Sequence, residues 1–316
     1  MKIKRDYLYN DLMQQLNDSR YIPTWVQAYM RKTTLMQTTI TSKMYHPFTF
    51  RLYHETTDSY LVKMIRHQLK SLNTYFTKNI GDLGTRKINI VLILSKKAKF
   101  IDKRKSKVID TENINSGVCI HHNDPETVHI IIYRVEDLMK VLFHEIIHYI
   151  GADLRFYDDD KIKSIEMMIQ THIPSLSNVE IYFNEAFTEA LARYHYSQYS
   201  YKHSVDSDPN TQLKKQQDYS IEVVKQFLAL YDCKNLKEFS KLKSYTEKSH
   251  AFSYIVIASA LLNNQDFISD VIMKGDLNDL KTIVYKALLQ DNGWYKAITN
   301  TSFKKNKMKF YFKLSI

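Results

Sequence analysis

The chain has 316 residues, of which 44% are hydrophobic, so it can form the core of one large domain or of two smaller ones. It contains only 6 glycines and 5 prolines, which argues against disorder and favours long regular elements, mostly helices. The two cysteines, Cys119 and Cys233, are too few for a disulfide framework or a cysteine-rich zinc site.

The net charge of +11 points to basic surfaces. Basic residues cluster within residues 96–107 and 304–309, where they could contact nucleic acid or an acidic partner. No recognisable nucleic-acid-binding motif accompanies them, so an ordinary solvated surface is the interpretation that we favour.

Neither a signal peptide nor a membrane span is expected. The first residues lead into no apolar stretch, and the longest apolar run, from Ile255 to Leu262, is too short to cross a bilayer. The low number of cysteines suits a reducing compartment. We therefore expect a soluble, intracellular protein of the cytoplasm.

The first part of the chain combines predicted helices with predicted strands. Residues 1–55 are expected to form an N-terminal helical extension, with helices near 6–17 and 23–38. Apolar residues at helical spacing predict a further helix over 60–78. Runs of β-branched and aromatic residues predict strands over 87–94, 117–120 and 127–134.

Helices dominate the rest of the chain. Residues 138–150 have hydrophobic side chains on nearly all sides, which is typical of a buried helix, and Gly151 is a plausible C-terminal cap. Later helices are expected over 159–172, 178–201, 213–231, 250–263 and 276–290.

This order predicts an α+β fold, in which a small mixed β-sheet packs on helices and a mostly helical C-terminal subdomain follows. We divide the chain into the extension, 1–55, a subdomain with the sheet, 56–202, and the helical subdomain, 203–316.

The most informative residues are 144–148, which read HExxH. Four residues are about one helical turn, so the imidazoles of His144 and His148 project from the same face and can hold one Zn²⁺. Glu145 then lies beside the metal-bound water as a general base. Two histidines and a glutamate are costly in a buried helix unless something satisfies them, and a metal ion would do so.

A catalytic zinc usually takes a third protein ligand. The longer pattern HExxHxxGxxH would place it at Leu154, which cannot bind metal, and Asp153 reads as a polar residue at the helix end. Glu185, in a helix that we expect to begin at a capping box over 177–180, is the better candidate. Glu189 lies four residues later on the same face and could hydrogen-bond a ligating histidine. The alternative is an amphipathic helix whose glutamates point to water.

This combination resembles the zincin metallopeptidases of the gluzincin type, among them thermolysin and the leukotriene-hydrolase-like aminopeptidases. Residues 184–187, Asn-Glu-Ala-Phe, are similar to the Asn-Glu-Gly-Phe around the glutamate ligand of those aminopeptidases. The resemblance implies a zincin-like fold in which His144, His148 and Glu185 bind zinc. The Gly-x-Met-Glu-Asn segment of the aminopeptidases is absent, so their specificity is not implied.

The resemblance also implies an activity, the hydrolysis of peptide bonds by a zinc-bound water that Glu145 activates. In the family a His or Tyr of the later helical part stabilises the oxyanion; our candidate is His250, with Tyr245 and Tyr254 as rivals. A peptide or protein substrate would add to an edge strand, at 117–120 or 127–134. Two other functions stay open: a catalytically silent zincin-fold protein used for binding or structure, and a basic nucleic-acid-associated protein.

Overall fold

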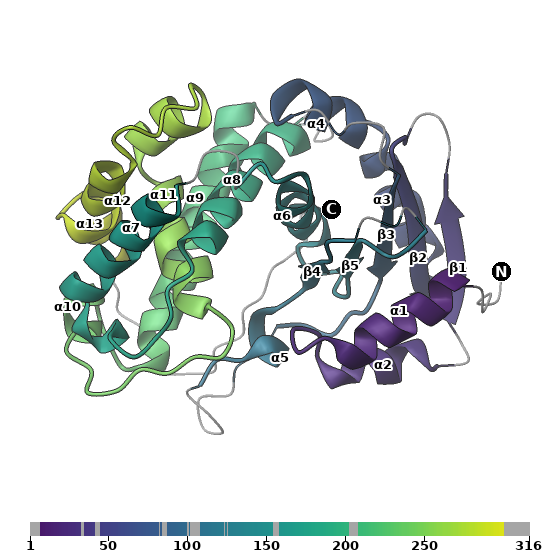
Figure 1. Ribbon diagram of the computed structural model, residues 1–316, viewed down its shortest axis with the longest axis horizontal. Helices are drawn as coiled ribbons and strands as arrows, with labels where there is room; N and C mark the ends of the chain where they lie inside the picture. Colours follow the sequence, from purple (N-terminus) through teal and green to yellow (C-terminus); the bar gives the residue numbers. More distant parts are fainter. Residues whose placement is uncertain are drawn as a thin grey trace. The chain divides into compact units, whose positions relative to one another are not determined.

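The computed structural model describes residues 7–32, 35–41, 45–81, 83, 87–99, 101, 108–122, 124, 126–153, 158–201 and 208–299. Within them the protein has an α+β fold with one five-stranded mixed sheet and a mostly helical remainder, which confirms the predicted class (Figure 1). Leu154 and the basic residues within 102–107 and 304–309 lie outside the described residues.

The described residues group into two compact units. The first comprises those within Met1–Lys99 and Asn115–Ala152, and it contains the sheet. The second comprises those within Phe100–Ile114 and Asp153–Phe310, and it is built from helices. The division of the sequence into 1–55, 56–202 and 203–316 stays a prediction.

The sheet of the first unit has the strand order β1-β2-β3-β5-β4. Its strands are β1 (Leu35–Ile40), β2 (Phe48–Glu55), β3 (Ile88–Ile93), β4 (Gly117–Cys119) and β5 (Ile130–Ile132). Strands β2, β3 and β5 run parallel, whereas β1 and β4 are antiparallel to their neighbours. The central strand β3 is buried along its whole length, as expected for a parallel strand covered on both faces.

Helices cover both faces of this sheet (Figure 1). The helices α1 (Tyr7–Asp18) and α2 (Thr24–Met30) pack on one face, where their apolar side chains join Tyr53, Val91 and Tyr133 in one core. The helix α6 (Leu138–Ile150) packs on the other face against β4 and β5. There its Phe143 meets Phe76 of α4 (Leu72–Asn79), which follows α3 (Ser59–Leu69).

The predicted helical extension over 1–55 is wrong in its second half. Helices α1 and α2 occur where helices were expected, but the helix predicted over 23–38 ends at Met30, and residues 35–40 and 48–55 are strands. Leu35 to Ile40 pair antiparallel with Glu55 to Phe50, and the β-branched residues of β1 suit a pleated surface. The paired residues are 10 to 20 positions apart, and the periodicity within one segment does not reveal such a pairing.

The second unit is a helical assembly in which α8 and α9 pack side by side. Its helices are α5 (Thr111–Ile114), α7 (Asp159–His172), α8 (Phe183–Ser200), α9 (Pro209–Leu230), α10 (Leu236–Phe239), α11 (Ala258–Leu262), α12 (Leu280–Leu289) and α13 (Gly293–Thr299). No helix in the described part of the chain is both long enough and apolar enough to traverse a lipid bilayer.

Candidate metal centre

The helix α6 carries the HExxH residues in a buried setting. It starts after Asp137, whose left-handed backbone (φ 56°) turns the chain away from β5, and it ends at Gly151, also left-handed (φ 67°). The N–H of Gly151 donates to the carbonyl of His148 over 3.0 Å, so the predicted glycine cap is confirmed. All residues from Leu138 to Ile147 are buried, His144 and Glu145 included. Their polar atoms therefore depend on partners inside the protein.

The two histidines of α6 point their Nε2 atoms at the same place. The Nε2 atoms of His144 and His148 are 3.0 Å apart, and the ring planes are inclined by 73°. Two nitrogens bound to one zinc ion at their usual lengths in a tetrahedral shell would lie about 3.3 Å apart. The pair therefore fits one shared metal ion with little adjustment.

Glu145 lies against the edge strand β4. A Cβ atom built on Gly117 would come within 2.8 Å of the Oε1 atom of Glu145 and 2.9 Å of the Cγ1 atom of Val141. Only a glycine leaves room for this approach of the carboxylate to the strand. Sequence reasoning missed this role of Gly117, although a glycine inside a strand is a signal of close approach.

The structure also distinguishes the two predicted edge strands. β4 is the last strand in the order and pairs only with β5 among the described strands, whereas β5 lies between β3 and β4. Of the two predicted edge strands, β4 is therefore the one at the edge, and its Gly117 leaves no room for a Cβ beside the carboxylate of Glu145.

The helix α8 presents Glu185 in its first turn. The predicted capping box over 177–180 is wrong, because α8 begins only at Phe183 and has no side-chain cap of its own. Groups distant in sequence bind the N–H donors there. The N–H of Tyr182 donates to the Oγ atom of Ser253 over 3.1 Å, and that of Phe183 donates to a carboxylate oxygen of Glu166 over 3.0 Å.

Glu189 is buried on the same helix. Its Oε1 atom pairs with the Nε atom of Arg193 over 2.8 Å, one turn further along α8. The contact with a ligating histidine that we expected for Glu189 stays a prediction. The ion pair with Arg193 gives this carboxylate a structural partner of its own.

The three rivals for the oxyanion donor lie in different surroundings. The hydroxyl of Tyr254 donates to the Oε2 atom of Glu185 over 2.7 Å. The hydroxyl of Tyr245 donates to Glu247 over 2.6 Å inside a buried aromatic cluster. Burial raises the pKa of Glu247, while hydrogen bonds from Tyr245 and from the backbone lower it. His250 has a left-handed backbone (φ 52°), and its ring lies 3.8 Å from that of Tyr182.

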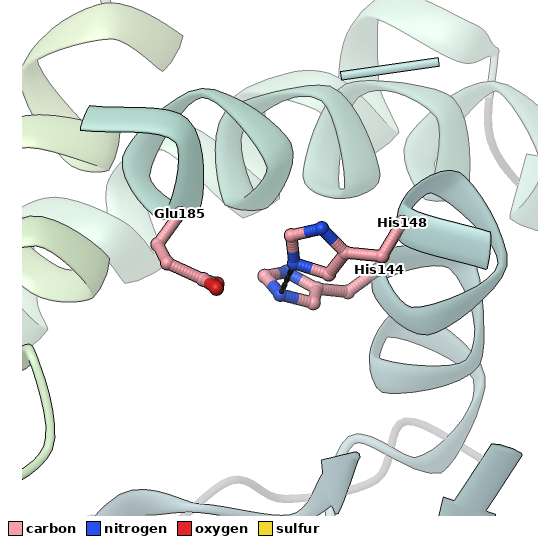
Figure 2. A group of neighbouring side chains, drawn as sticks. All are labelled: His144, His148 and Glu185. Carbon is pink, nitrogen blue, oxygen red and sulfur yellow. Dashed lines mark hydrogen bonds between the residues drawn. The ribbon is translucent and has the colours of Figure 1, made fainter. Parts of the chain in front are cut away.

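Three predicted ligands form one group. His144, His148 and Glu185 each offer a ligand atom, and these atoms all lie within 4.8 Å of one another. Figure 2 shows the two imidazoles and the carboxylate directed toward a common point. Asp153 is buried and does not belong to this group. Two imidazoles and one carboxylate suit zinc, and the same donors also suit other divalent ions such as iron.

Comparison with known proteins identifies no characterised relative of this chain. No family model matches the chain, and no solved structure matches it. An uncharacterized protein of Acanthamoeba polyphaga mimivirus is 27% identical over 176 residues, which cover 52% of this chain and 44% of that protein. The chain thus aligns with less than half the length of this relative.

Proposed function

We propose that the protein is a zinc-dependent metallopeptidase with a zincin-like catalytic site. The observation that carries the proposal is the pair of Nε2 atoms of His144 and His148, 3.0 Å apart on a buried helix. The family resemblance of the HExxH residues and of residues 184–187 supports it. The donor set of two imidazoles and one carboxylate, with Glu185 as third ligand, fits zinc.

When bound, the zinc ion would polarise the scissile carbonyl and lower the pKa of a water molecule. Glu145 takes a proton from that water at its carboxylate and later delivers it to the leaving amine. The close approach to Gly117 holds this carboxylate beside β4. The backbone of β4 orients the peptide as an added strand, so the scissile bond lies within reach of Glu145.

The proposal is tested by metal analysis combined with a cleavage assay. The purified protein should contain close to one zinc ion per chain, and His144→Ala should lose it. Glu145→Gln should keep the metal and lose the cleavage of a broad peptide library. A protein that binds zinc yet cleaves no peptide would support the silent zincin-fold alternative. A protein that takes up no zinc at neutral pH would overturn the proposal.

A further inference from the structure

One hydrogen bond reaches a proposed metal ligand directly. The hydroxyl of Tyr254 donates to the Oε2 atom of Glu185 over 2.7 Å, a short distance typical of a hydroxyl bound to a charged carboxylate. Both residues belong to the second unit, so the bond depends only on the packing of that unit. The hydrogen bond is made to one of the two carboxylate oxygens of Glu185.

The backbone that carries Tyr254 is unusual. Residues Ser253–Ile257 form a π-helical turn that leads into α11. Such turns are rare, and they often occur at functional sites because the extra residue reorients the side chains. His250, just before it, has a left-handed backbone, which is uncommon for a residue other than glycine. The chain is therefore held in a costly local conformation at this point.

Buried contacts hold this segment in place. The carboxylate of Glu247 accepts the hydroxyl of Tyr245 over 2.6 Å and the N–H of Phe252 over 2.8 Å, so it satisfies the start of the helical turn. Residues 108–110 lie beside Glu247, because Ile109 bridges to it and accepts the N–H of Lys248 over 2.9 Å.

The same segment also contacts the start of α8. Ser253 accepts the N–H of Tyr182 over 3.1 Å, and the ring of His250 lies against that of Tyr182. Three successive contacts, from His250, Ser253 and Tyr254, thus fix the first turn of α8, which includes Glu185. The packing of this segment against α8 therefore fixes the position of Tyr254.

We infer that Tyr254 is a positioning residue for the metal ligand Glu185. Its hydroxyl holds Oε2, so that Oε1 alone is offered to the ion and the carboxylate binds through one oxygen. This role rests on the proposed metal site. It differs from that of an oxyanion donor, because the hydroxyl proton of Tyr254 is used on the ligand. Partners of this kind typically change metal affinity about 10- to 100-fold when they are removed.

The opposite role for this hydrogen bond, competition with the metal, predicts the opposite change in zinc affinity. If Tyr254 competed with the metal for Glu185, removing its hydroxyl would tighten zinc binding. If Tyr254 positions the carboxylate, the same change weakens zinc binding and frees Oε2 to become a second ligand oxygen. Zinc affinity and coordination number therefore separate the two roles without any measurement of hydrolysis.

The experiment measures zinc affinity by chelator competition on the full chain and on Tyr254→Phe, together with the visible spectrum of the cobalt(II)-substituted proteins. We expect Tyr254→Phe to bind zinc about 10- to 100-fold more weakly. We expect the intense visible bands of four-coordinate cobalt in the unaltered protein and weaker, five-coordinate bands in the variant. Tyr285→Phe is the matched control, since it removes a tyrosine hydroxyl on α12 of the same unit, where the ring of Tyr285 lies 5.4 Å from that of His172. It should leave zinc affinity and spectrum unchanged.

Unchanged or tighter zinc binding by Tyr254→Phe, or equal weakening by Tyr285→Phe, would overturn the inference while the proposed function stands. A five-coordinate cobalt spectrum of the unaltered protein would also overturn it, whether or not Tyr254→Phe folds. Failure of the proposed function gives a different result, in which the unaltered protein binds no zinc or Glu185→Ala keeps its full zinc affinity.

Discussion

Gly117→Ala tests the contact between β4 and the proposed general base. The new Cβ would lie 2.8 Å from the Oε1 atom of Glu145 and 2.9 Å from the Cγ1 atom of Val141. The van der Waals separation between a carbon atom and either of these atoms is about 3.5 Å, so the carboxylate must move away by roughly half an ångström or more. The backbone of Gly117 needs no left-handed conformation, so the effect comes from the added methyl group alone.

Two consequences of this change can be measured separately. Overpacking against Val141 should lower the free energy of unfolding by about 1–3 kcal/mol, measured by urea denaturation. A catalytic group misplaced by about 1 Å can cost 100-fold, so a displacement of half that size should lower kcat/KM about tenfold. Zinc content should not change, because the three atoms nearest to the new Cβ belong to Glu145 and Val141 and not to a proposed metal ligand.

Gly293→Ala is the matched control for this prediction. An added Cβ at Gly293 meets nothing within 4 Å, so stability and activity should stay as they are or improve slightly. If Gly117→Ala proved as stable and as active as Gly293→Ala, the reasoning about the close approach would be refuted.

Two further predictions concern the second unit. Burial lowers the pKa of His195 to about 4. Between about pH 6.5 and pH 4, His195 is therefore protonated in the unfolded chain and neutral in the folded chain. Stability should therefore be full above pH 6.5 and fall as the pH drops toward 4. In urea titrations, His195→Gln should reduce this pH-dependent loss of unfolding free energy by up to about 3 kcal/mol. The same pH dependence in the variant and the unaltered protein would contradict this. Arg193→Met leaves the buried charge of Glu189 without its ion-pair partner. It should cost about 3–5 kcal/mol in unfolding free energy, and a neutral result would exclude a buried ion pair.

The sequence predicted best those elements whose signals are local. Helix α7 occurs over the predicted residues 159–172, because its periodicity and acidic first turn act within the helix itself. Helix α6 was likewise visible from its apolar run and from Gly151. The helix predicted over 60–78 is interrupted at Lys70 and Ser71, between α3 and α4, which periodicity alone did not mark.

The elements that the sequence did not reveal depend on contacts with other segments of the chain. Strands β1 and β2 exist as a pair, and the first strand alone resembles the end of a helix. The start of α8 is set by Ser253 and Glu166, so a local capping signal pointed to the wrong residue. The sequence favoured His250 as the oxyanion donor over Tyr245 and Tyr254, and it gave no sign that the hydroxyl of Tyr254 donates to Glu185.

X-ray absorption at the zinc edge of the purified protein tests the ligand set most directly. The account predicts a shell of nitrogen and oxygen at about 2.0–2.2 Å, with the outer scattering of two imidazole rings and no sulfur. His148→Ala should remove one of the two imidazole contributions. A sulfur shell at about 2.3 Å, which would implicate Cys119 or Cys233, or a shell without imidazole would contradict it.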